Sequence, residues 1–181
     1  MEDRKILKKN QNYIEIAGII ILAAIARLVP HPPNVAPITG LALFSGAKIK
    51  NKTAYFVPLL TMFVSDFVLG FHSTMLYVYI SFFIIVLIGK VIKNKKNSLL
   101  LPASLVSSLL FYLITNFGVW FSTTLYPKSL FGLVNCYIMG LPFLRNTVVG
   151  DLFYSFVFFY GYSYFLVLIK KLAYNFKDEK S

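Results

Sequence analysis

The chain has 181 residues, of which 57% are hydrophobic, 17% are aromatic and only 14% are charged. Soluble domains carry about 25% charged residues, so this chain has too few charges to build a water-facing surface. The composition therefore predicts an integral membrane protein, and the length suits one compact domain over residues 1–181. The single cysteine, Cys136, excludes an internal disulfide and a metal site built from several cysteines.

Six segments are candidates to cross a bilayer, which takes about 20 apolar residues with a range of about 17–25. In chain order, the expected spans are Tyr13–Val29, Val35–Ile49, Thr53–Phe71, Leu76–Ile92, Leu99–Leu125 and Thr147–Ile169. The second span is the weakest, because it is short and contains Pro37. A further uncharged stretch, Ser129–Phe143, is also short, and we expect it to form a re-entrant or interfacial segment between helices five and six. The expected fold is an all-α bundle of six transmembrane helices.

The positions of the basic residues support six spans, because Lys and Arg collect on the cytoplasmic side of membrane proteins. With six spans, all 18 cations except Arg27, Lys128 and Arg145 fall on one side. Both termini, with short basic tails at 1–12 and 170–181, are then cytoplasmic, and the expected location is the inner (cytoplasmic) membrane. The net charge of +11 is explained by this anchoring to the lipid bilayer, so we expect no nucleic-acid partner.

Unusual polar residues concentrate in the outer half of the predicted bundle. Asp66 and Asp151 lie near the outer ends of the third and sixth spans, and Arg27 closes the first span. Asn116 and Trp120 are four residues apart, so they share one face of the fifth helix. Ionisable groups within spans usually face a bundle interior or a wet cavity, because insertion costs roughly 2.5–3.5 kcal/mol each. The distribution predicts a pocket that opens to the outside.

Ten residues are expected to bind the substrate of this pocket. They are Arg27, His31, Asn34, Asp66, His72, Asn116, Trp120, Arg145, Asn146 and Asp151. Structural alternatives exist: the two aspartates could pair with the two arginines, and Trp120 could belong to the interfacial aromatic belt. Because no metal-ligand spacing and no enzyme motif occurs, we expect no cofactor, no metal and no enzymatic activity. An intramembrane carboxylate dyad of Asp66 and Asp151 is the catalytic alternative.

The stretch RLVPHPPNVAPITG, from Arg27 to Gly40, contains four of the eight prolines. Proline fixes φ and removes a backbone donor, so this loop can cross the top of a bundle with little flexibility. Pro37 is expected near the first turn of the second helix, where its missing donor costs little. We therefore predict a stiff outer rim over the pocket.

Several motifs resemble an uncharacterised family of bacterial integral membrane proteins across nearly the whole chain. They are RLVPHPPNVAPITGLALFSGA, VPLLTMFVSDFVLGFH, VYISF, NFGVW and YPKSLFGLVNCYIMGLPFLRNTVVGDLFYS. That family in turn resembles the substrate-binding S components of energy-coupling factor (ECF) transporters. The shared features are six spans, a small size, both termini inside, a short second span and the PLL…SDFVLG sequence of the third span.

The S-component resemblance implies a six-helix bundle that binds a vitamin-like micronutrient near the outer surface. It also implies partners, namely a transmembrane coupling protein and cytoplasmic ATPases, since the chain has no nucleotide-binding motif of its own. The alanine-xxx-alanine docking motif of S components is absent, because Ile21 stands four residues after Ala17. The expected function is substrate binding for ECF-type uptake. A solitary carrier, or a structural or assembly protein with no transported substrate, is the alternative.

Overall fold

The computed structural model describes residues 2–49, 51–95, 97–164 and 167, and these form six α-helices and no strand. The helices are α1 (Glu2–Leu28), α2 (Ile38–Lys48), α3 (Thr53–Leu69), α4 (Met75–Ile92), α5 (Leu100–Ser122) and α6 (Leu130–Phe156). A short 3-10 turn, η1 (Asn97–Leu99), precedes α5, and a π-helical turn, η2 (Val157–Gly161), continues α6. The all-α prediction is confirmed. The predicted tail 1–12 is largely inside α1, whereas the tail 170–181 lies outside the described residues.

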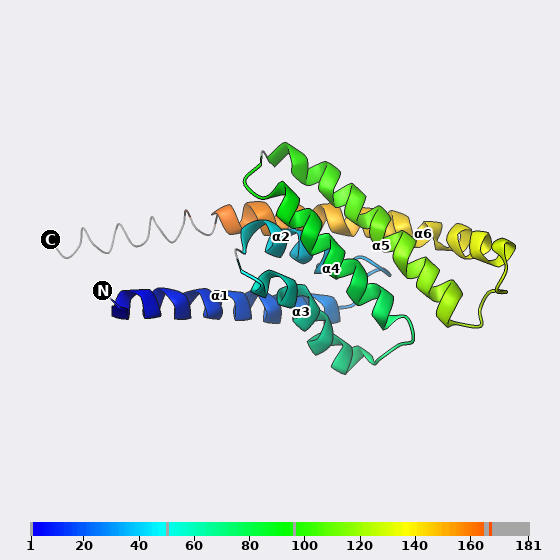
Figure 1. Cartoon of the computed structure of the whole chain (residues 1–181), viewed down its shortest axis with the longest axis horizontal. Coiled ribbons are helices and arrows are strands. Elements are labelled where there is room, and N and C mark those ends of the chain that lie inside the picture. Colours follow the sequence, from blue (N-terminus) through cyan, green and yellow to red (C-terminus); the bar gives the residue numbers. More distant parts are fainter. Residues whose placement is uncertain (1, 50, 96, 165–166, 168–181) are drawn as a thin grey trace.

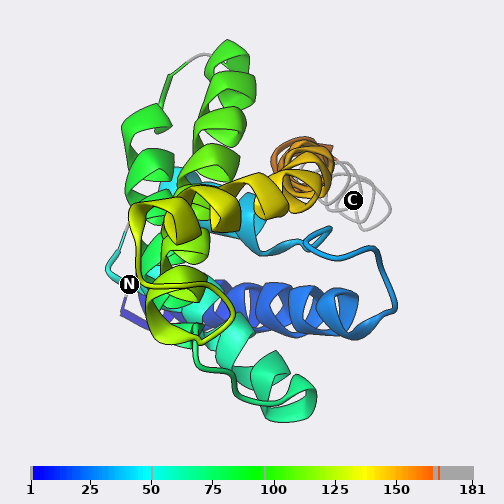
Figure 2. The ribbon, with the colours of Figure 1, turned by 90° about the vertical axis from the view of Figure 1, so that its right-hand side faces the viewer.

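The helices alternate in direction along the long axis of the molecule. The start of α1 and the turn η2 lie at the same end, on the left of Figure 1. At the opposite end, α1, α3 and α5 finish while α2, α4 and α6 begin, and Figure 2 shows this end from outside. The loop 29–37 lies here between α1 and α6 (Figure 2). We call this the loop end of the bundle.

The short helix α2 forms the centre of the fold. Its 11 residues extend only about 16 Å at 1.5 Å per residue, and every residue from Ile38 to Ala47 is buried. It packs against α3, α4 and α6. Glycines permit the closest approach: a Cβ at Gly46 would lie 2.2 Å from the Val86 carbonyl oxygen of α4, and one at Gly40 would lie 2.7 Å from the Ser155 nitrogen of α6.

The predicted break between Ser129–Phe143 and the sixth span is wrong. Ser129 caps the start of α6, where its side chain accepts a hydrogen bond from the Gly132 amide, and the helix then continues without a loop to Phe156. Pro142 lies inside the helix without ending it. Arg145 sits in mid-helix with an exposed side chain, so its charge did not mark a turn. The first half of α6 is thus part of the main bundle.

Two helices in the described part of the chain, α4 and α5, are long and apolar enough to cross a membrane, and α3 is a shorter apolar helix. The surface and the interior differ in an unusual way. Large apolar side chains such as Phe67, Val68 and Leu76 are 65–71% exposed, whereas twelve polar side chains among the described residues, including Asp66 and Asp151, are buried. Soluble proteins bury most of their large apolar residues, so this surface suits an apolar solvent.

Candidate functional site

A cavity of about 700 Å³ lies at the loop end of the bundle. Small-molecule sites in proteins usually occupy about 300–1,000 Å³. Its walls come from the end of α1, the loop 29–37, the start of α2, the second half of α3, the loop 70–74, the first half of α4, the second half of α5 and positions 136–151 of α6. The cavity therefore draws on every helix of the fold.

Six of the ten residues predicted from the sequence line this cavity. They are Arg27, His31, Asn34, His72, Asn116 and Asp151. The lining also contains aromatic and hydroxyl side chains that the sequence did not single out, namely Phe82, Phe111, Phe143, Thr39, Thr115 and Thr147. The walls thus combine apolar surface with a few polar groups, which is the usual composition of a small-molecule site.

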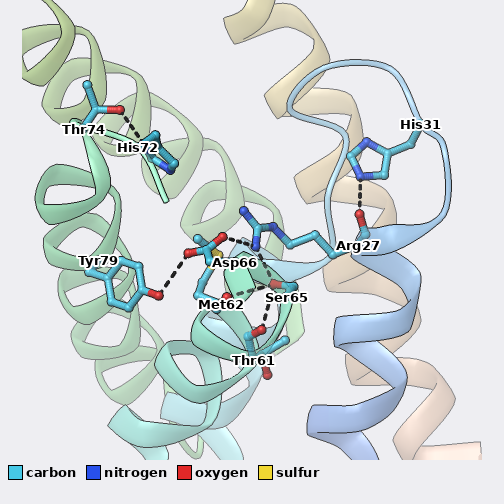
Figure 3. A network of polar contacts seen from close by, with 9 residues as sticks. All are labelled: Arg27, His31, Thr61, Met62, Ser65, Asp66, His72, Thr74 and Tyr79. Carbon is cyan, nitrogen blue, oxygen red and sulfur yellow. Dashed lines mark hydrogen bonds and ion pairs between the residues drawn. The ribbon is translucent and has the colours of Figure 1, made fainter. Parts of the chain in front are cut away.

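Arg27 and Asp66 form an ion pair at the edge of the cavity (Figure 3). The Arg27 Nη1 atom lies 2.6 Å from Asp66 Oδ1 and also donates to the Ser65 hydroxyl, while the Tyr79 hydroxyl donates to Asp66 Oδ2 at 3.0 Å. Asp66 is 1% exposed and Arg27 is 15% exposed. The network joins α1, α3 and α4, and for Asp66 the structure has the pairing with Arg27 that was the structural alternative to substrate binding. The carboxylate of Asp66 thus compensates the charge of Arg27 within the protein.

Asp151 has a different environment. It is 1% exposed, it lines the cavity, and its Oδ2 atom accepts a hydrogen bond of 2.7 Å from the Ser108 hydroxyl of α5. The Thr39 hydroxyl of α2 is the second hydroxyl group beside this carboxyl. No Lys or Arg in the described residues forms an ion pair with it. The alternative pairing of Asp151 with Arg145 is therefore wrong, because Arg145 lies exposed on another face of α6.

Asn116 occupies the wall between α5 and α6. Its Nδ2 donates to the Tyr112 carbonyl oxygen at 2.8 Å, and its amide lies directly against Gly140, where a Cβ would come within 2.4 Å of Asn116 Oδ1. The Cys136 thiol donates to the Asn116 carbonyl oxygen at 3.3 Å. The helices therefore approach closely here, and Asn116 is part of the cavity lining at this contact.

The loop 29–37 closes one side of the cavity. One ring nitrogen of His31 lies 3.1 Å from the Arg27 carbonyl oxygen, and Asn34 adopts a left-handed conformation with φ of 65°. Asn146 of α6 donates from Nδ2 to the Pro33 carbonyl oxygen at 3.1 Å. Asn146 thus fastens the loop to α6 from outside the cavity, and Pro37 directly precedes α2 as predicted.

The remaining predicted residues lie away from the cavity lining. Trp120 donates from its indole nitrogen to the Pro127 carbonyl oxygen at 2.9 Å, beyond the end of α5. Asp66 lies behind Arg27, and Arg145 is exposed. Trp120 and Asn116 share a helix face, as predicted, but only Asn116 reaches the lining.

The hydroxyl groups beside Asp151 were missed at the sequence level, although a signal was present. Ser104, Ser107 and Ser108 recur at helical spacing in an apolar helix, and all three are fully buried. Residues three and four apart share a helix face, so this spacing marks a polar stripe on α5. Two of the three serines contact α6: Ser108 donates to Asp151, and the hydroxyl oxygen of Ser104 lies 3.4 Å from that of Ser155.

No group of three or more His, Cys, Asp or Glu side chains gathers in the described part of the chain. The two aspartates also have different partners, because Asp66 binds Arg27 and Tyr79 whereas Asp151 binds Ser108. The site therefore consists of an aromatic and hydroxyl-rich cavity with one neutralised ion pair at its edge and one separate carboxyl group.

The model of the Family of unknown function (DUF6580) matches residues 7–172. The chain belongs to this family. No curated protein and no solved structure matches the chain. No match relates it to the S components of ECF transporters.

Proposed function

We propose that this protein is a membrane-embedded binding protein that captures a small, vitamin-like molecule in the cavity at the loop end. The cavity itself carries the proposal: it has the volume of a small-molecule site, and six residues chosen from the sequence meet in its lining. Its aromatic walls offer apolar contact, and Asn116 and Thr115 offer hydrogen bonds that orient a ligand.

The surface of the bundle supports a membrane location. Exposed large apolar residues cover α3, α4, α5 and α6, and few charges interrupt them. Lys48, Lys52, Lys90 and Lys93 all lie at the end of the bundle opposite the cavity. Because lysines favour the cytoplasmic side, this arrangement supports a cavity that opens to the outer side, where an uptake protein would meet its substrate.

Uptake would follow the ECF scheme that the S-component resemblance implies. The chain has no nucleotide-binding motif, so a transmembrane coupling protein and ATPases would supply the energy. The helix α1 packs against α3 and leaves Ile21, Leu22 and Ile25 more than half exposed. This apolar face offers a surface for such a partner without the strict alanine motif. The proposal includes no catalytic step, since Asp66 and Asp151 share no hydrogen-bond partner.

The test is the small molecule that the protein retains. Native mass spectrometry of protein released from membranes is expected to find one molecule per chain. Its affinity should fall about 5- to 15-fold in Asn116→Ala, because one hydrogen bond contributes about 1–1.5 kcal/mol. Trp120→Ala truncates the same helix one turn away and should leave the affinity within about twofold. The absence of any retained or added ligand in the wild-type protein would contradict the proposal.

A structural or assembly role is the second candidate. The observation that favours it is the ion pair of Arg27 with Asp66, which joins α1 to α3 and, through Tyr79, to α4. On this view Asp66→Asn weakens folding and nothing else. A variant that folds normally but loses uptake of the retained molecule would count against it.

A further inference from the structure

The electrostatics of the cavity narrow the ligand to one chemical class. Four side chains of the cavity lining belong to residue types that can be charged near neutral pH, namely Arg27, Asp151, His31 and His72. Arg27 is 2.6 Å from Asp66, so its charge is already compensated. The two histidines lie in the loops 29–37 and 70–74, outside the helices. The carboxyl group of Asp151 has no positively charged partner among the described residues.

A buried carboxylate without a cation is energetically unfavourable. Hydroxyl donors such as Ser108 and Thr39 stabilise the carboxylate only in part, because the free-energy cost of removing an ionised carboxylate from water exceeds the stabilisation that neutral hydrogen bonds provide. An ammonium group in the cavity would supply the missing charge, and charge-assisted hydrogen bonds of this kind are the stronger ones. The position of Asp151, 1% exposed and on the cavity wall, gives such a group a dry and oriented partner.

The lining also argues for an organic cation over a metal ion. No group of three metal-ligating side chains is present in the described part of the chain, and the volume of about 700 Å³ far exceeds that of an ion. The rings of Phe82, Phe111 and Phe143 line the same space. Aromatic faces attract organic cations through their quadrupole and provide apolar contact for the rest of the molecule.

The separation of the polar groups sets the length of the ligand. Ser108, which marks the position of Asp151, and Asn116 are two turns apart on α5, which is about 12 Å at 1.5 Å per residue. A ligand that reaches both groups therefore has its positive charge at one end and a hydrogen-bonding group at the other. The apolar middle faces Phe111 and Phe82.

We propose that the cavity binds an organic monocation, an aromatic or otherwise apolar amine, whose ammonium group pairs with Asp151. This inference rests on the proposed function and names the substrate class of the same site. The Arg27–Asp66 pair takes no direct part in recognition of the charge. An amine is thus selected by a single carboxylate in an otherwise charge-balanced pocket.

Three probes of nearly equal size test the charge: tryptamine, indole-3-acetamide and indole-3-acetate. Binding is measured by calorimetry on the full chain in lipid nanodiscs. Tryptamine should bind at least tenfold more tightly than the neutral amide, and the anion should bind most weakly. In Asp151→Asn the affinity for tryptamine should fall about 10- to 100-fold, while that for the amide stays within about twofold.

Ser155→Ala is the matched control. Ser155 is a buried hydroxyl one turn after Asp151 on α6, and it is outside the cavity lining, so the tryptamine affinity should not change. Should Asp151→Asn fail to fold, the ranking of the three probes on the wild-type protein still decides the question.

Equal or tighter binding of the amide or the anion would overturn the inference and leave the proposed function standing. Binding of tryptamine that Asp151→Asn does not weaken would also overturn it. If none of the three probes binds at millimolar concentration, the inference fails, and the retained-molecule experiment decides separately whether the proposed function fails with it.

Discussion

The ion pair between Arg27 and Asp66 should be a large single contribution to the stability of the bundle. Asp66 is 1% exposed and Arg27 is 15% exposed, so removal of either partner leaves a largely buried charge. Breaking a buried pair in this way costs about 3–5 kcal/mol. Arg27 borders the cavity and can be partly solvated there, whereas Asp66 cannot. Asp66→Asn should therefore cost about 3 kcal/mol, the low end of that range, and Arg27→Met should cost more.

The assay is reversible unfolding in mixed micelles, followed by the fluorescence of the single tryptophan, Trp120. In the double variant Arg27→Met/Asp66→Asn no buried charge is left unpaired, so its cost should fall below the sum of the single costs by about 2 kcal/mol, within the range seen for directly contacting residues. Arg145→Gln removes an exposed charge and should stay within about 0.5 kcal/mol of the wild type. A cost below about 1 kcal/mol for Asp66→Asn, well under the range for a broken buried pair, or strict additivity in the double variant, would refute this reasoning.

Two further predictions concern packing and the loop. Gly46→Ala would place a methyl group 2.2 Å from the Val86 carbonyl oxygen. The overpacking should lower the free energy of unfolding by about 2–3 kcal/mol. The control Gly18→Ala, with nothing within 4 Å of its Cβ, should be neutral or slightly stabilising in the same unfolding assay. Asn146→Ala removes the hydrogen bond to the Pro33 carbonyl oxygen. It should accelerate hydrogen exchange in the loop 29–37 and lower the free energy of unfolding by about 1 kcal/mol. Unchanged exchange would show that the bond does not hold the loop.

Most helix boundaries follow closely from hydrophobic runs, with two exceptions: α1 begins at Glu2, 11 residues before the predicted span, and α6 continues across the predicted break. The predicted span Thr53–Phe71 corresponds to α3, which ends two residues earlier, because Gly70 takes a positive φ of 94°. The sequence predicts Ser129–Phe143 as a segment separate from the sixth span, because it is short and a seventh span would place the basic C-terminus on the outer side. Arg145 lies between these two predicted segments. Its side chain is exposed on a continuous helix, and only the three-dimensional position of a charge reveals whether it needs a partner.

The candidate site was predictable in part. The predicted positions of Arg27, Asn116 and Asp151 along the bundle axis were enough to indicate that they lie near one cavity, because the direction and length of a helix determine how far along the axis each residue lies. It was not enough to show that Trp120 bonds to the Pro127 carbonyl oxygen, since that contact depends on the turn after α5. The pairing of Asp151 with Ser108 likewise depends on how α5 and α6 are rotated about their axes, which a single sequence does not determine.

The proposed function requires that the cavity at the loop end holds a small molecule. Its most direct test compares the molecule retained by the wild-type protein with that retained by Thr115→Trp, which fills the cavity from α5. Val106→Trp, at an exposed position of the same helix, is the control. We expect native mass spectrometry to find one bound molecule per chain in the wild type and in Val106→Trp, and none in Thr115→Trp. Equal retention by both tryptophan variants, or no retention by any of the three proteins, would contradict it.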